Sequence, residues 1–126
     1  MMANLHQRPD RVLFVEDEVI IRLDIAIALQ EAGFQVIEAD TPDGALPLLD
    51  AGKQPDVLLT DVRAPGKLDG LMLARMVRDR LAKVSVIIVS ADASMEPAAG
   101  QLGKFMRKPY HVRRILEPVK EVAVHR

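Results

Sequence analysis

The chain has 126 residues, of which 49% are hydrophobic and 28% are charged; its formal net charge is −1, and it contains no cysteine. This length allows one domain with its own core, and the balanced charge provides no overall field that would draw the chain to nucleic acid or to an anionic membrane. The lack of cysteine excludes disulfides and thiolate metal sites, so any metal must be bound by oxygen or histidine ligands.

The first part of the chain predicts a strand followed by a helix. Residues 12–15 form a continuous apolar run, which is typical of a strand buried on both faces. Residues 19–32 have the spacing of an amphipathic helix, and Gly33 provides a natural end. One stripe of this helix carries Ile20, Leu23 and Ile27.

A second strand and helix follow. The short apolar run at 35–39 predicts the strand. We expect a helix over 41–51, because Thr41 suits the N-cap and Pro42 suits the first helical position. Pro47 should disturb this helix, since proline removes a backbone hydrogen bond from a helix interior.

The middle of the chain repeats the pattern. The apolar run at 57–59 predicts a third strand, and the run at 86–89 predicts a fourth. Between them, residues 70–81 predict a helix with one apolar face, formed by Leu73, Met76, Val77 and Leu81. From 94 to 103 few apolar residues are available to anchor a helix, so a fourth helix should be short or irregular.

The last segments complete the fold prediction. Residues 104–107 predict a fifth strand, and residues 111–124 predict a final helix that Pro118 must kink or break. Strands that alternate with helices imply parallel pairing through right-handed crossovers. We therefore predict an α/β fold with a doubly wound, five-stranded parallel sheet of the flavodoxin-like type. It forms one domain over 1–126, with a polar extension at 1–9.

Polar residues follow four of the predicted strands, at the edge where an open parallel sheet places its functional crevice. They are Glu16 and Asp17 after the first strand, Asp61 after the third, Ser90 after the fourth and Lys108 after the fifth. Clustered carboxylates repel unless a cation neutralises them, and oxygen ligands in a hydrated site suit Mg²⁺. One carboxylate is then a candidate nucleophile towards phosphorus, while an ammonium and a hydroxyl stabilise phosphoryl oxygens.

These residues lie in segments that resemble the receiver domain of bacterial response regulators, over nearly the whole chain. Residues 12–18 (VLFVEDE) resemble its first strand and acidic pair, and residues 56–61 (DVLLTD) resemble the third strand that ends in the phosphoacceptor. Residues 86–91 (VIIVSA) resemble the fourth strand with its hydroxyl switch residue, and residues 105–110 (FMRKPY) resemble the fifth strand with its lysine. Each motif is weak alone, but the four in this order are specific.

The resemblance implies that Asp61 is the phosphoacceptor, next to a site for Mg²⁺ (or Mn²⁺). Asp17 and Asp61 would bind the metal through carboxylates, Glu16 directly or through water, and Arg63 through its main-chain carbonyl. Glu16 stands where an aspartate is more usual, but it keeps a carboxylate. The loop over 63–70 is one residue longer than usual and adds positive charge, which could alter the lifetime of the phosphate.

The resemblance also implies how the protein signals. A histidine kinase or a histidine phosphotransfer protein donates a phosphoryl group to Asp61, with Lys108 and Ser90 contributing to the reaction. Ser90 and Phe105 then move as a switch and change the surface for a protein target; for Phe105, a core aromatic is the alternative. Such a chain is not an enzyme on a separate substrate, because it promotes only its own phosphorylation and dephosphorylation.

We expect a stand-alone cytoplasmic receiver. Residues 1–11 have no signal-peptide core, no apolar run approaches the roughly 18 residues that cross a bilayer, and the chain ends where the fifth helix does. Nucleic acid and membranes are therefore not expected partners. Direct action on a target, relay of phosphoryl groups and drainage of a kinase all stay open, and a homodimer through the face of the fourth and fifth helices is a further expectation.

Three other functions compete with this prediction. A flavin mononucleotide site needs a hydroxyl- and glycine-rich loop after the first strand, where Glu16, Asp17 and Glu18 would repel the phosphate. A DNA-binding regulator needs an output domain. A pseudo-receiver, a protein-interaction module that is not phosphorylated, is the remaining alternative, although the acids, hydroxyl and lysine argue against it. Asp61 taken alone could be a turn-capping residue.

Overall fold

The computed structural model describes residues 10–52, 54–63, 68–108 and 111–124. The predicted extension at 1–9 and part of the loop over 63–70 lie outside these residues. No helix within the described part of the chain is long and apolar enough to cross a membrane.

Five parallel strands form one sheet in the order β2-β1-β3-β4-β5. The strands are β1 (Arg11–Val15), β2 (Gln35–Ala39), β3 (Val57–Asp61), β4 (Ser85–Ser90) and β5 (Lys104–Arg107). This order reverses next to β1, which leaves the crevice of a doubly wound sheet at the carboxyl ends of β1 and β3. The predicted fold class is confirmed.

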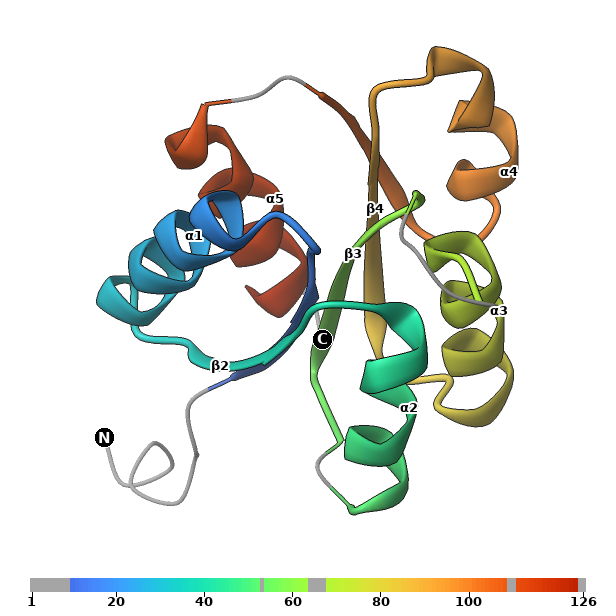
Figure 1. The fold of residues 1–126 in the computed structure, drawn as a ribbon, viewed down its shortest axis with the longest axis horizontal. Coiled ribbons are helices and arrows are strands. Elements are labelled where there is room, and N and C mark those ends of the chain that lie inside the picture. The colour runs from blue at the N-terminus through green and yellow to red at the C-terminus, as the bar shows by residue number, and fades with distance from the viewer. Residues whose placement is uncertain (1–9, 53, 64–67, 109–110, 125–126) are drawn as a thin grey trace.

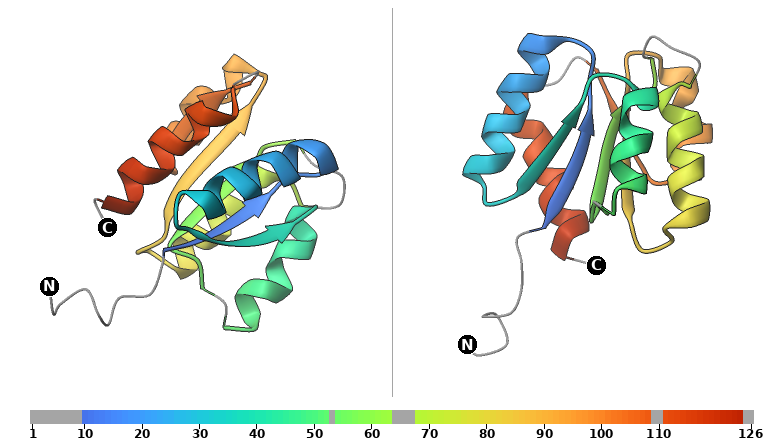
Figure 2. Two further views of the ribbon diagram at one scale, coloured as in Figure 1. Left: turned by 90° about the vertical axis from the view of Figure 1, so that its left-hand side faces the viewer. Right: turned by 60° about the horizontal axis from the view of Figure 1, so that its bottom comes forward.

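The helices cover both faces of the sheet, as Figures 1 and 2 show. Helices α1 (Val19–Glu31) and α5 (Val112–Val124) lie on one face, and helices α2 (Pro42–Asp50), α3 (Gly70–Arg80) and α4 (Glu96–Gly100) lie on the other. A single 3₁₀ turn, η2 (Ala93–Met95), precedes α4. The prediction of a short fourth helix is confirmed, because α4 has only five residues.

Alternate strand residues fill two cores, one on each side of the sheet. In β1, Val12 and Phe14 pack under α1 and α5, whereas Leu13 and Val15 pack on the side of α2, α3 and α4. Successive side chains of a strand point to opposite faces, so a strand buried on both sides must be apolar throughout. This requirement explains the continuous apolar runs in the sequence.

The apolar stripe that predicts α1 is not its buried face. Ile20 is 73% exposed, and Leu23 and Ile27 are also exposed. The buried residues of α1 are Ile25, Ala26 and Leu29, and the partly buried Ile21 packs against the same core. The helix is apolar on much of its circumference, so its sequence alone does not determine which side meets the sheet.

Two prolines lie inside helices without ending them. The predicted cap of α2 is confirmed, because the Thr41 side chain accepts a hydrogen bond from the Gly44 N–H at 3.0 Å. The helix nevertheless continues through Pro47, and α5 continues through Pro118. Pro118 is buried beside Val119, so apolar packing offsets the hydrogen bond that proline removes. Of the kink or break predicted at Pro118, the break does not occur, and Pro47 does not end α2.

Candidate functional site

Lys108 joins two carboxylates at the carboxyl edge of the sheet. Its Nζ donates a hydrogen bond to Asp61 Oδ2 at 2.5 Å and another to Glu16 Oε1 at 3.1 Å. Glu16 follows β1, Asp61 ends β3 and Lys108 follows β5. Three residues that are far apart in the sequence thus form one ion-paired network, as the positions of the strand ends predict.

Glu16 is the most deeply buried charge of this network, with 2% of its surface exposed. Its second oxygen, Oε2, accepts a hydrogen bond from the Glu18 N–H at 3.1 Å. Burial raises the pKa of Glu16 above its ordinary value, and the hydrogen bonds from Glu18 and Lys108 only partly counter this effect. A carboxylate in this position gains from any additional cation nearby.

Lys108 remains a strong cation although it is mostly buried. Burial by itself disfavours the ammonium, but the hydrogen bonds to Asp61 and Glu16 outweigh burial and raise the pKa of Lys108. The side chain is therefore charged at neutral pH. An ammonium placed against Asp61 can pair with an anionic group that is attached to Asp61.

Close packing holds Asp61 in place. Its Oδ1 accepts a hydrogen bond from the Arg63 N–H at 3.1 Å. Gly70, at the start of α3, lies so close beneath it that a Cβ there would be 1.8 Å from the Asp61 carbonyl oxygen. Only glycine allows this approach of α3 to the end of β3.

Glu16 and Asp61 share the single ammonium of Lys108, so their negative charge is only partly neutralised. The next question is whether the carboxylates of this edge fit a Mg²⁺ ion. Asp17 is exposed and follows Glu16 directly, so a third carboxylate is adjacent in the chain. The described residues contain no group of three His, Cys, Asp or Glu side chains arranged to hold an ion. Mg²⁺, however, binds through one or two carboxylates and keeps several waters. The oxygen-only donors Glu16, Asp17 and Asp61 fit that requirement.

Ser90 is buried at the end of β4 and belongs to a local hydrogen-bonded turn. Its Oγ accepts a hydrogen bond from the Asp92 N–H at 3.0 Å, and its carbonyl accepts one from the Lys108 N–H at 2.9 Å. Asp92 in turn accepts hydrogen bonds from the Ser94 hydroxyl at 2.6 Å and the Ser94 N–H at 2.9 Å. These hydrogen bonds from Ser94, with the charges of Arg63 and Arg107, lower the pKa of Asp92.

The remaining predicted site residues, Arg63 and Phe105, lie outside the ion pairs of Lys108. Arg63 reaches Asp61 through its backbone N–H. Phe105 is half-buried in β5 and packs against the core on the side of α3 and α4. The Lys108 network does not include Phe105, so its predicted role as a switch rests on the resemblance alone.

The sequence patterns did not identify two neighbours of the site. Arg22 donates a hydrogen bond to the Glu16 carbonyl, and Asp92 lies within the Ser90 turn. The partners of Arg22 are a backbone oxygen and a glutamate 16 positions away, which no local pattern reveals. For Asp92, the D-x-S spacing of a capping turn was the available signal.

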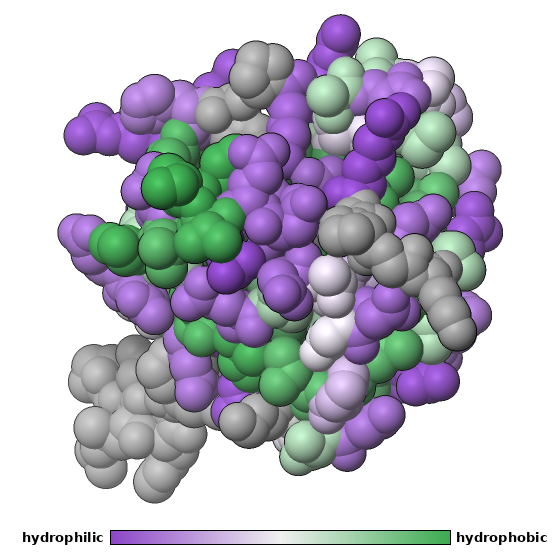
Figure 3. Space-filling view, viewed as in Figure 1, coloured by the Kyte–Doolittle hydropathy of each residue, from purple (hydrophilic) through white to green (hydrophobic). Residues whose placement is uncertain are grey.

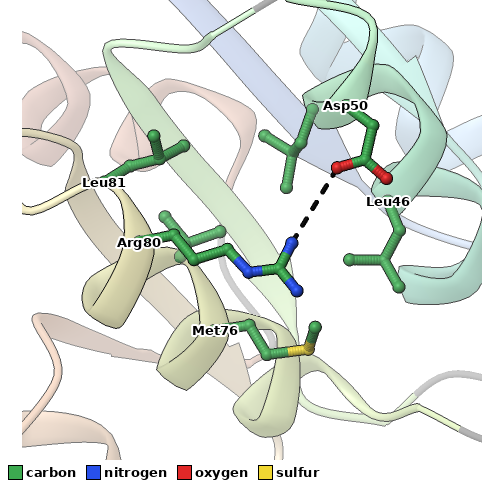
Figure 4. Close-up of a pocket in the computed structure, with 7 residues that line it drawn as sticks. Leu46, Asp50, Met76, Arg80 and Leu81 are labelled. Carbon is green, nitrogen blue, oxygen red and sulfur yellow. Dashed lines mark ion pairs between the residues drawn. The ribbon is translucent and has the colours of Figure 1, made fainter.

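A pocket between α2 and α3 is separate from this site. It has a volume of about 120 Å³, an apolar wall that includes Leu46, Met76 and Leu81, and an exposed Asp50–Arg80 ion pair of 3.8 Å at its rim (Figure 4). None of the predicted site residues lines it.

Comparisons with known proteins point to one family. A family model described as "Response regulator receiver domain" matches residues 12–120. The transcriptional regulatory protein PdtaR of Mycobacterium tuberculosis is 32% identical over 122 residues, which cover 94% of this chain and 58% of PdtaR. The chain therefore spans less than two thirds of this curated relative.

Solved structures show the same fold. A response regulator receiver protein from Sinorhizobium medicae has a TM-score of 0.83 and 25% identity, over 90% of this chain and 94% of that one. The response regulator protein TrrA from Thermotoga maritima, solved in complex with Mg²⁺-BeF, has a TM-score of 0.80 and 25% identity, over 90% of this chain and 98% of that one.

Proposed function

The chain belongs to the response regulator receiver family, and on that premise we propose that it accepts a phosphoryl group on Asp61 in a Mg²⁺-dependent reaction. The observation that carries this proposal is the Lys108 ammonium, which bridges Asp61 and Glu16. A turn-capping aspartate would need no buried cation beside it. A receiver needs one, because its aspartate becomes a dianionic acyl phosphate.

In the proposed reaction, a carboxylate oxygen of Asp61 attacks the phosphorus of a phosphohistidine. The new O–P bond forms as the P–N bond breaks, and the electron pair of the P–N bond stays on the imidazole nitrogen. The Lys108 ammonium, already held at Asp61, moves to a phosphoryl oxygen and compensates its charge. Glu16 keeps Lys108 near the site during this exchange.

Glu16, Asp17, Asp61 and the carbonyl of Arg63 would hold Mg²⁺. The ion would neutralise the clustered carboxylates and the transferred phosphoryl oxygens. Before it binds, Lys108 compensates Glu16 and Asp61. The exposed Asp17 is the carboxylate that remains accessible for the ion from the solvent side.

Ser90 is proposed to transmit the change. The Ser90 side chain would rotate so that its hydroxyl donates a hydrogen bond to the phosphoryl group. In this rotation it would lose the hydrogen bond that it now accepts from the Asp92 N–H. The turn from Ser90 to Ser94 would then rearrange as a unit, and Phe105 would turn inward, which changes the surface around α4 and β5. This surface is the proposed contact for a protein target.

The exposed stripe of α1 supports docking of the phosphodonor. Val19, Ile20, Leu23 and Ile27 form an apolar surface over this helix, visible in green at the left of Figure 3. The stripe begins two residues after Asp17, so a protein that covers it can bring a histidine to Asp61. A receiver domain implies a histidine kinase partner, and we propose that the kinase or a phosphotransfer protein covers this stripe.

The phosphorylation itself is tested by mass. The purified protein is incubated with Mg²⁺ and acetyl phosphate, and its intact mass is measured beside those of Asp61→Asn and Asp50→Asn. We expect a base-labile phosphate adduct in the wild type and in Asp50→Asn, but not in Asp61→Asn. No adduct and no affinity for Mg²⁺ in the wild type would instead support the pseudo-receiver alternative. Cytoplasmic location, stand-alone action and a homodimer stay predictions.

A further inference from the structure

Arg22 connects the acidic turn of the site to the edge of the sheet. It lies on α1, and its Nη1 donates a hydrogen bond of 2.8 Å to the backbone carbonyl of Glu16. Its Nε donates to Glu38 Oε1, on β2, at 3.2 Å. The Arg22 side chain is only 17% exposed, so its guanidinium is held between two partners rather than free in solvent.

The carbonyl that Arg22 binds belongs to the peptide between Glu16 and Asp17. A peptide unit is planar, so an orientation imposed on its oxygen also determines the direction of the Asp17 N–H and Cα. On the other side of Glu16, its N–H donates to the Ala39 carbonyl at 3.0 Å. Both backbone groups of Glu16 are thus bound, and the direction in which the chain leaves towards Asp17 is set.

We propose that Arg22 is a positioning residue, which orients the Glu16–Asp17 peptide and thereby prepares the two carboxylates for a divalent cation. This inference rests on the proposed function. Glu38 has a supporting role, since it aligns the guanidinium and neutralises a charge that would otherwise repel the cation. Neither Arg22 nor Glu38 needs to touch the ion or the phosphoryl group.

A positioning role and a purely electrostatic role of Arg22 predict opposite changes in Mg²⁺ affinity, so substitutions of Arg22 distinguish them. If the charge of Arg22 alone mattered, Arg22→Gln would remove a repulsive cation and tighten Mg²⁺ binding, while Arg22→Lys would leave it unchanged. If Arg22 positions the turn, both variants weaken binding, because neither side chain presents the guanidinium fork that reaches the Glu16 carbonyl and Glu38 together. We expect a loss of about tenfold, typical of residues that support metal ligands.

The experiment measures the Mg²⁺ dissociation constant of unphosphorylated wild type, Arg22→Lys, Arg22→Gln and Glu38→Gln by NMR titration. Arg80→Gln is the matched control, because Arg80 pairs with Asp50 on the exposed rim of the α2–α3 pocket. Amide exchange of Glu18, whose N–H is bound by Glu16 Oε2, is followed without metal. Faster exchange of the Glu18 amide in both Arg22 variants is expected, while amides of the sheet core exchange as in the wild type, which separates local loosening of the turn from a loss of global stability.

The outcomes distinguish this inference from the function on which it rests. Weaker Mg²⁺ binding in both Arg22 variants, with Arg80→Gln unchanged, supports positioning. Unchanged or tighter binding in Arg22→Gln, while the wild type binds Mg²⁺ and is phosphorylated, overturns the inference and leaves the proposed function intact. A wild type that neither binds Mg²⁺ nor forms the adduct contradicts the proposed function, and the inference fails with it.

Discussion

The turn after β1 and the segment after β4 leave the same edge of the sheet but are held in different ways. Glu16, after β1, is bound by groups from β2, α1 and the residue after β5: the Ala39 carbonyl, Arg22 and Lys108. After β4, hydrogen bonds join Ser90, Asp92 and Ser94 largely to one another. The acidic turn is therefore fixed by tertiary structure, whereas the Ser90 turn is a local unit.

This difference suits the two proposed tasks. A cation site benefits from ligands that are already in place, since less ordering is needed when the ion binds. A switch needs a segment with a second arrangement of similar energy, and local hydrogen bonds can be exchanged without disturbing the core. The short α4 that follows η2 adds little packing to resist the change.

The largest expected effect comes from replacing Lys108, which binds Glu16 of the acidic turn and Asp61. Lys108→Met should slow phosphorylation of Asp61 by acetyl phosphate about 100-fold, because the cation that meets the phosphoryl oxygen is lost. The rate is measured by intact mass against time. Lys120→Met, on the exposed side of α5, is the control and should react at the wild-type rate. A wild-type rate in Lys108→Met would contradict the proposed mechanism.

A pair of glycines compares the packed end of β3 with the end of α4, in the segment after β4, by stability. Gly70→Ala would place a Cβ against the Asp61 carbonyl, and we expect a loss of about 3 kcal/mol in the free energy of unfolding. Gly100, at the end of α4, has no atom within 4 Å of such a Cβ. Gly100→Ala should therefore change stability by no more than about 0.5 kcal/mol. Urea denaturation measures both, and equal losses would contradict the difference in packing between these two positions.

Arg78 restricts the movement of one end of the segment after β4, at Leu102. From α3, its guanidinium donates to the Leu102 carbonyl at 2.6 Å and to the Val84 carbonyl at 3.1 Å, which ties down the chain between α4 and β5. Arg78→Gln should lower the free energy of unfolding by about 2 kcal/mol, because the partly buried carbonyls of Leu102 and Val84 lose their hydrogen-bond donor. Arg75→Gln, exposed on the same helix, is the control. Faster amide exchange confined to residues near Leu102 would locate the effect.

The smallest expected effect concerns the acid stability of the Ser90 turn. Hydrogen bonds from Ser94 lower the pKa of Asp92 below its ordinary value of 3.8. The stabilisation is therefore present above that value and is lost as the pH falls through the lowered pKa. Asp92→Asn should melt slightly below the wild type near neutral pH, and the difference should vanish in acid. A difference that does not depend on pH would exclude the carboxylate as its source.

Much of the fold could be predicted from residue patterns. The continuous apolar runs locate the central strands β1, β3 and β4, because each of these is buried on both faces. The edge strands β2 and β5 are only partly buried, and shorter, weaker runs locate them. The poor pattern near α4 correctly indicates a short helix. Neither Pro47 nor Pro118 ends its helix, because the loss of one hydrogen bond is smaller than the gain from packing the whole helix.

The residues of the candidate site could also be predicted, since parallel strands bring their carboxyl ends to one edge and the chemistry follows from residue type. The sequence by itself therefore determined the sheet and the meeting of Glu16, Asp61 and Lys108. Only the tertiary structure decided that α1 exposes Ile20 and buries Leu29, and that Arg22 binds the Glu16 carbonyl. Helix rotation and contacts to backbone oxygens depend on neighbours distant in the chain, so no local pattern records them.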